Sequence, residues 1–183
     1  MEPGGTTNTV TNLGDGDRGS RVISLARAGV NVQNSSFLLG EHGPFTNFNP
    51  SDLPWGDKDH FTAQWSFSFP IAYTFGFHVT DTLSNHHIIY YSNADANISG
   101  VDPEFGLGTW TTDGFWHSVT RDLLLDLREG TGNNLLQIST VDGFEVWMNV
   151  GSGRVDDVIL CRPFSSVRYD NAALNYKTVF TAW

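Results

Sequence analysis

Two neighbouring runs of alternating residues constrain the fold of this chain more than any other feature. In residues 61–69, apolar side chains stand at every second position, with polar ones between them. Residues 72–80 repeat the pattern after a break at Pro70. A period of two places the apolar side chains on one face of a β-strand, so both runs predict strands that line a core. We expect these two strands to pair with each other as a hairpin or meander.

Further runs rich in β-branched and aromatic residues recur between turn clusters. They predict strands near residues 20–27, 34–39, 86–92, 115–121, 135–140, 144–150 and 154–160. Helix formers dominate only in residues 123–128, just before Gly130 and Gly132, which predicts one short helix. Two spans rich in turn residues, 40–58 and 93–108, are expected to be long loops. The predicted fold class is all-β, with two sheets.

Length and charge narrow the classes of function. A chain of 183 residues fits one domain. Its net charge of −10, from 20 acidic and 10 basic side chains, repels nucleic acid and anionic lipid surfaces. The single cysteine, Cys161, has no partner for an intrachain disulfide. No apolar stretch reaches the ~20 residues of a membrane span, and the first residues lack a signal peptide, so an exported protein would be in its processed form.

Three blocks occur in order: DRGSRVI at residues 17–23, DGFWHSVTRDL at 113–123 and GSGRVDD at 151–157. Together they resemble bacterial secreted jelly-roll modules, which are similar to carbohydrate-binding domains. The resemblance implies a two-sheet jelly-roll β-sandwich with long loops and one short helix over residues 1–160. It also implies non-catalytic binding of a polysaccharide outside the cell or at its surface. Residues 161–183 form a C-terminal tail without a counterpart in such modules.

The GSGRVDD block joins two glycines, a guanidinium group and adjacent carboxylates at the start of a strand. Carboxylates in such a place suit a hard cation such as Ca²⁺, although no spacing matches a dedicated calcium loop. The resemblance implies a structural Ca²⁺ between Asp15 or Asp17 and Asp156 or Asp157. The alternative is that arginines at positions 18, 21 or 154 pair with these carboxylates without a metal.

A sugar-binding surface needs exposed aromatic rings for the apolar faces of the sugar and polar groups for its hydroxyls. The candidate residues are Trp55, Trp110, Trp147, Asp57 and Arg121. Trp147 is expected to share a strand face with Glu145. The alternative for each tryptophan is a place in the core or as a loop anchor.

Two other classes of function stay open. The tail could provide an extra strand to its own domain or donate one to a neighbouring copy, as in a self-assembling extracellular filament or surface layer. An enzyme would draw on His117, Asp122 and Asp126, but no serine or cysteine stands in an activating sequence context, so no catalytic residue is predicted. His86 and His87 must face opposite sides of a strand and therefore cannot bind one metal together.

Overall fold

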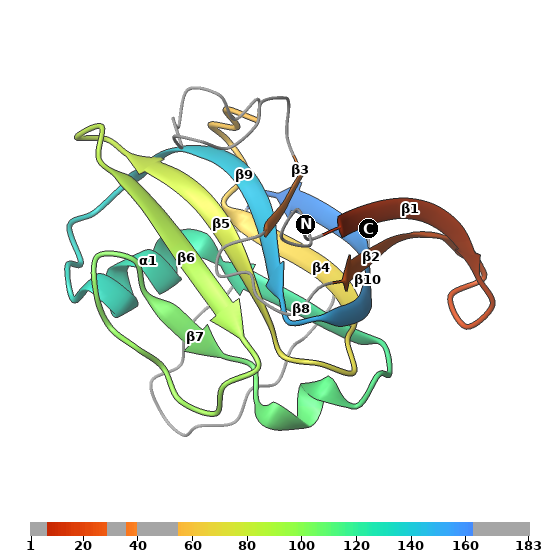
Figure 1. The fold of residues 1–183 in the computed structure, drawn as a ribbon. Helices are drawn as coiled ribbons and strands as arrows, with labels where there is room; N and C mark the ends of the chain where they lie inside the picture. The colour runs from red at the N-terminus through yellow and green to blue at the C-terminus, as the bar shows by residue number, and fades with distance from the viewer. Residues whose placement is uncertain (1–6, 29–35, 40–54, 163–183) are drawn as a thin grey trace, which may run out of the picture.

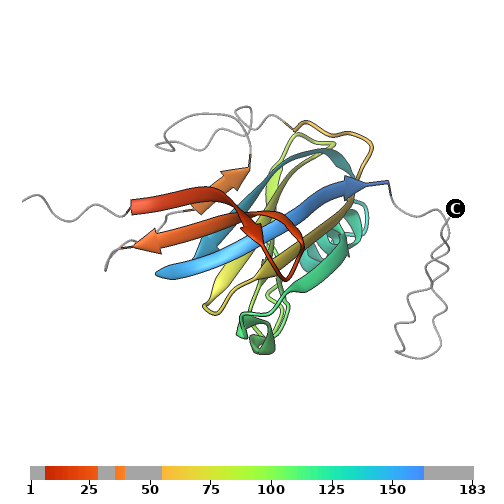
Figure 2. The ribbon, with the colours of Figure 1, turned by 90° about the vertical axis from the view of Figure 1, so that its right-hand side faces the viewer.

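The computed structural model describes residues 7–28, 36–39 and 55–162, and within them ten strands form two sheets that lie face to face (Figures 1 and 2). The first sheet has the order β1 (Thr7–Asp15), β2 (Ser20–Ala28), β10 (Gly151–Cys161), β4 (Thr62–Ser68) and β8 (His117–Asp122). The second has the order β3 (Ser36–Leu39), β9 (Ile138–Met148), β5 (Tyr73–Asp81), β6 (His86–Ser92) and β7 (Glu104–Gly106). This arrangement confirms the predicted all-β jelly-roll sandwich.

The two alternating runs form β4 and β5, and their inward faces make the core. Trp65 of β4 is fully buried, with its ring centroid 5.2 Å from that of Phe77 on β5. Phe67 and Phe75 lie 4.9 Å apart in the same way. Burial of one such aromatic side chain against the opposite sheet typically contributes several kcal/mol, about 3–5 by truncation to alanine.

The predicted pairing of these two strands is wrong. β4 pairs with β10 and β8 in the first sheet, and β5 pairs with β9 and β6 in the second. The chain crosses from one sheet to the other at Pro70, so the two apolar faces meet across the core instead of side by side. The alternation was correct about which face is buried, but it does not specify which strand is the neighbour.

Three other strand expectations need correction. The predicted strands at 135–140 and 144–150 are one strand, β9, because Val141 and Gly143 both pair with β5 across a bulge. β1 was not predicted, since its residues from Asn8 to Asn12 are exposed on both faces and carry no period of two. β7 lies inside the span that was expected to be a loop.

The predicted helix is α1 (Leu123–Thr131), which follows β8 directly. The Asp122 side chain caps its first turn by accepting a hydrogen bond from the Leu125 backbone, and Gly132 ends it with a left-handed φ of 69°. Leu123 and Leu127 bury the inner side of the helix in the core. In the described part of the chain, no helix has the length and apolarity that a membrane crossing requires. The tail from residue 163 onward lies outside the described residues.

The glycines of the GSGRVDD block serve the core. Gly153 lies inside β10 opposite Phe69, where a Cβ atom would stand 2.1 Å from two ring carbons of that side chain. Gly151 has a φ of 141°, a conformation that side-chain-bearing residues rarely adopt. A bulge follows at Asp157, whose φ is 52°. These glycines were expected at a strand start as part of a site, whereas Gly153 makes room for an aromatic ring.

Candidate functional site

The four acidic residues that the resemblance singles out lie near one another. The β1–β2 turn, which carries Asp15 and Asp17, lies against the part of β10 that carries Asp156 and Asp157. The Asp15 carboxylate is buried and accepts hydrogen bonds from the Asp17 backbone at 2.9 Å and from Arg154 Nη1 at 2.7 Å. Burial opposes its ionisation, but these bonds and one from the Arg18 backbone outweigh burial and lower the pKa of Asp15.

Arginine occupies the space between the remaining carboxylates. Arg18 Nε lies 3.5 Å from Asp156 Oδ2, and Arg18 Nη2 pairs with Asp157. The same guanidinium lies 4.9 Å from the ring centroid of Trp116. Among the described residues, no three acidic, histidine or cysteine side chains are arranged to hold a metal. The carboxylates that face guanidinium groups do not fit a Ca²⁺ site in this arrangement, so Ca²⁺ stays a prediction of the resemblance alone.

Trp55 and Asp57 anchor a loop to β9. Trp55 is half-buried and packs against the core, and the Asp57 backbone exchanges hydrogen bonds of 3.0 and 2.8 Å with Val141. The Asp57 carboxylate accepts bonds from the backbone of Asp59 and from the His60 ring at 2.9 Å. Burial opposes its ionisation, but these bonds lower the pKa of Asp57. Both side chains therefore have local structural partners.

Trp147 lies on the outer face of the second sheet, between Ser36 of β3 and Thr74 of β5. It is half-buried, and its indole Nε1 is buried with no hydrogen-bond partner among the described residues. Glu145 shares this face, as predicted, and is buried with its Oε1 3.5 Å from His78 Nε2. Trp147 thus stands beside a buried polar pair, not in a loop with open access.

Arg121, which was predicted to contact sugar, belongs to a network that fixes α1 to the sheets. Its guanidinium makes two bonds to Asp126, of 2.8 and 2.7 Å, and lies over the rings of Tyr91 and Phe105. The Tyr91 hydroxyl donates to the same carboxylate at 2.5 Å. Burial, followed by the charge of Asp126, raises the pKa of Tyr91 well above its usual value. Asp122 and Asp126 were the carboxylates considered for an enzyme. Asp122 caps α1 and Asp126 bonds to Arg121, so both are engaged in structural contacts.

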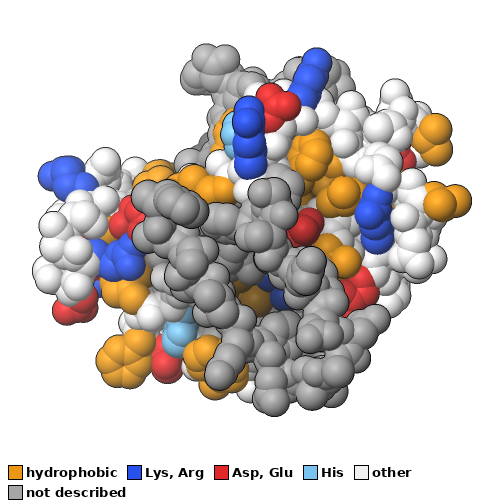
Figure 3. Space-filling model, turned by 180° about the vertical axis from the view of Figure 1, so that it is seen from behind, with side chains coloured by type: hydrophobic (Ala, Val, Ile, Leu, Met, Phe, Trp, Pro, Cys, Tyr) orange, Lys and Arg blue, Asp and Glu red, His pale blue; other side chains and the backbone are white. Residues whose placement is uncertain are grey.

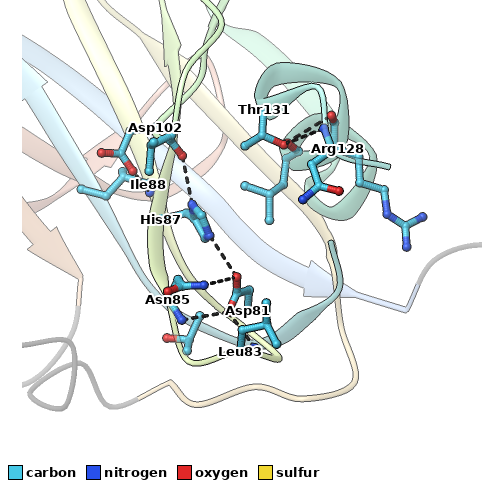
Figure 4. A network of polar contacts seen from close by, with 12 residues as sticks. Asp81, Leu83, Asn85, His87, Ile88, Asp102, Arg128 and Thr131 are labelled. Carbon is cyan, nitrogen blue, oxygen red and sulfur yellow. Dashed lines mark hydrogen bonds and ion pairs between the residues drawn. The ribbon is translucent and has the colours of Figure 1, made fainter. Parts of the chain in front are cut away.

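A second buried network closes the turn between β5 and β6 (Figure 4). Asp81 accepts bonds from the backbones of Leu83 and Asn85, each at 2.8 Å. His87 stands between Asp81 Oδ2, 3.4 Å from its Nε2, and the Val101 carbonyl, 3.0 Å from its Nδ1. His87 faces inward and His86 outward, as predicted for neighbours on a strand. The network binds a turn and a loop together and contains no nucleophile.

The exposed aromatic side chains of the loop before β8 form a different kind of surface. Trp110 lies on the short 3₁₀ helix η2 (Thr109–Thr112) with 67% of its area exposed, and Phe115 is 72% exposed. The Trp110 ring stands edge-on to the His117 ring, with centroids 5.0 Å apart. His117 Nε2 lies 2.8 Å from Asp113 Oδ1. We call Trp110, Asp113, Phe115 and His117 the rim platform.

Local contacts hold the rim platform in place. Gly108 lies directly under Trp110, where a Cβ atom would come within 2.3 Å of the indole nitrogen. The Thr111 hydroxyl bonds to the Tyr73 hydroxyl at 2.6 Å, while Asp95 accepts a bond of 2.8 Å from the Thr109 backbone. Burial raises the pKa of Tyr73 to about 12, so this hydroxyl keeps its proton at neutral pH. η2 is therefore tied to the core at its centre.

The Asp113 carboxylate is the polar centre of the rim platform. A hydrogen bond from His117, followed by one from the Phe115 backbone, lowers the pKa of Asp113. It is therefore ionised at neutral pH, and its side chain is 38% exposed. Asp113 and Phe115 were not predicted as site residues, although both stand in the DGFWHSVTRDL block. The turn at Gly114, whose φ is 78°, lies between them, and Asp113 bonds to His117, whose ring stands against Trp110.

The three predicted tryptophans do not converge on one site. Trp55 contacts β9 at Asp142, five positions from Trp147, which corresponds to ~16 Å along a strand. Trp110 lies beside β8, at the far edge of the other sheet. Seen from behind, the exposed hydrophobic side chains around the margin form small separate groups among charged ones (Figure 3). Of these three tryptophans, only Trp110 combines high exposure with adjacent polar groups among the described residues.

Comparisons with known proteins identify no family. No protein-family model matches the chain, and no curated protein matches it in sequence. Among solved structures, it is similar to the family 11 carbohydrate-binding module of the cellulosomal cellulase Lic26A-Cel5E of Clostridium thermocellum, with a TM-score of 0.49 and 10% identity. The match covers 90% of this chain and 87% of that one. A likeness of this degree decides neither the family nor the ligand.

Proposed function

We propose that this protein binds carbohydrate without catalysis, through the rim platform. The observation that carries the proposal is Trp110, a large apolar ring that is 67% exposed yet held by defined contacts. Sugar rings present apolar CH faces that stack on such a side chain. Phe115 offers a second exposed ring on the same loop.

The polar half of the rim platform supplies hydrogen bonds of the kind that sugars require. The ionised Asp113 uses Oδ1 for His117, and its exposed carboxylate can accept further bonds from neighbouring sugar hydroxyls. Bonds to a charged acceptor are stronger than neutral ones, typically by a factor of about two. The orientation of Asp113 is set before binding, which reduces the entropy lost on association.

The hydrogen bonds and ion pairs of three described acidic side chains support binding without reaction. A glycosidase needs two carboxyl groups that flank the scissile bond, one as acid and one as base or nucleophile. Asp113 stands in the rim platform with His117, while Asp122 and Asp126 are engaged by α1 and by Arg121. We therefore assign the rim platform to recognition of a polysaccharide. We include an extracellular location in the same proposal, because the bacterial modules that the sequence resembles are secreted and bind polysaccharide outside the cell.

The test is affinity electrophoresis of the full chain in gels that contain different soluble polysaccharides. We expect at least one polysaccharide to retard the protein, and Trp110→Ala to abolish most of that retardation. Loss of one stacking contact of about 1–1.5 kcal/mol corresponds to roughly a tenfold weaker affinity. The matched control is Leu135→Ala, which removes an exposed apolar side chain near the opposite end of β5.

Two results would refute the proposal. One is the absence of retardation by every polysaccharide in a broad panel. The other is retardation that persists in Trp110→Ala but disappears in Trp147→Phe, since that would place the sugar on the outer face of the second sheet.

A further inference from the structure

β1 is a long edge strand of the first sheet and is uncharged from Thr7 to Gly14. It spans nine residues, TNTVTNLGD, and among the described strands it pairs only with β2. The ribbon of β1 and β2 reaches out from the side of the sandwich (Figure 1). Residues 8–12 are exposed, including Val10 at 62%. The outward backbone N–H and C=O groups of such an edge are available to another strand.

The other edges of the described sheets are shorter or interrupted. β3 and β7 have four and three residues. β8 has charged side chains at Arg121 and Asp122 and runs directly into α1, which ends the edge. Natural edge strands commonly avoid association through charge, brevity or covering elements. Within residues 7–28, 36–39 and 55–162, β1 has none of these before Asp15, so its open edge needs another explanation.

We propose that two copies of this chain pair through β1, antiparallel about a two-fold axis. An isologous contact of this kind closes on itself and satisfies the outward backbone groups of both strands. Electrostatics favour association of two copies through this segment. Residues 7–28 contain three arginines and two aspartates, whereas the whole chain has a net charge of −10. Two copies therefore meet here without the repulsion that their acidic surfaces impose elsewhere.

The pairing has a geometric consequence for the sandwich. It joins the two five-stranded sheets into one of ten strands, with β8 at each outer end. Nine strand spacings of ~4.8 Å separate these ends by roughly 43 Å. If the proposed function holds, the two rim platforms beside β8 would bind one polysaccharide chain bivalently and gain affinity from their linkage. This consequence alone rests on the proposed function, since the pairing itself does not involve sugar.

Sedimentation velocity of the full chain without sugar, over a concentration series, tests the pairing. We expect the weight-average mass to rise toward twice that of one chain. The double variant Thr9→Lys, Thr11→Lys puts two charges on one exposed face of β1, opposite their counterparts in the second copy. It should weaken association at least tenfold, whereas Thr120→Lys on the exposed face of β8 should not. Circular dichroism establishes that each variant is folded.

Hydrogen exchange provides an independent measurement on the unaltered chain. Backbone amides within residues 7–15 should exchange at least tenfold more slowly at high protein concentration, while amides of β8 should not change. A wild-type chain that stays monomeric up to its solubility limit would overturn the proposal. So would association that survives the double lysine variant, or that disappears when residues 176–183 are deleted, because the pairing strand would then lie elsewhere.

Discussion

Gly153 offers the sharpest test of how the two sheets pack. Its Cβ position in an alanine variant lies 2.1 Å from Cδ1 and Cε1 of Phe69 and 2.7 Å from Cγ. Phe69 is fully buried and cannot turn away freely, since its ring lies 5.2 Å from Tyr73 and 5.8 Å from Phe75. Gly153→Ala must therefore displace the Phe69 ring or the β10 backbone.

The expected cost combines two opposing effects. Overpacking of a core typically costs about 1–3 kcal/mol, and the enclosed ring argues for the upper end. Loss of glycine flexibility in the unfolded chain returns about 0.4–1 kcal/mol. The net destabilisation is about 2 kcal/mol, or a fall in Tm of about 4–8 °C for a domain of this size. Urea unfolding followed by tryptophan fluorescence measures the free energy, and calorimetry measures Tm.

The control is Gly16→Ala, because an added Cβ there meets no atom within 4 Å and the residue has no positive φ. Its effect should stay within about 0.5 kcal/mol. Phe69→Leu should relieve the overlap, so the double variant Gly153→Ala, Phe69→Leu should be more stable than the sum of the single effects. An unchanged Tm in Gly153→Ala, or strict additivity in the double variant, would refute the proposed contact.

Three further predictions concern the polar networks. Asp126→Asn should lower the free energy of unfolding in urea by about 2 kcal/mol. This is less than the cost of breaking a fully buried ion pair, because Arg121 is partly exposed. A change under about 0.5 kcal/mol would contradict this role of Asp126. Burial opposes ionisation of Asp81, but hydrogen bonds from Asn85 and neighbouring groups lower the pKa of Asp81 below the unfolded value of about 3.9. The ionised Asp81 therefore stabilises the fold above pH ~3.9. This stabilisation is lost as the pH falls through the pKa of Asp81 in the folded protein. The drop in Tm at acid pH should therefore be smaller in Asp81→Asn, and an identical drop would count against the network. Arg154→Gln should raise the pKa of Asp15, which carbon NMR of the carboxyl group measures. A chelator should leave the Tm of the wild-type protein unchanged. A large fall in Tm on chelation would instead support bound Ca²⁺.

The sequence predicted the parts of the fold that depend on local periodicity. Alternation identified the buried faces of β4 and β5, and helix formers before Gly132 located α1. Alternation could not identify strand partners, because pairing is decided by contacts between distant segments. β1 escaped prediction for a related reason, since a strand exposed on both faces has no apolar period. The role of Gly153 was hidden because it depends on Phe69, which is far away in the sequence.

The predicted sugar contacts have different surroundings in the structure. Trp110 was named as a sugar contact, and the structure leaves it exposed beside a carboxylate. Arg121 was assigned to the same surface, but its partner Asp126 lies on the helix that follows β8, and the fold turns both inward. The proximity of the β1–β2 turn to Asp156 and Asp157 followed from the resemblance. Residue types alone could not decide whether a Ca²⁺ ion or an arginine lies between these carboxylates.

Fluorine NMR of the protein with its six tryptophans replaced by 5-fluorotryptophan tests whether sugar binds at Trp110. Each resonance is assigned by single substitution to phenylalanine, and the protein is titrated with oligosaccharides from a polysaccharide that retards it. The resonance of Trp110 should shift progressively to saturation, while that of the buried Trp65 stays in place. Saturable shifts at Trp147 with Trp110 unchanged would contradict the account.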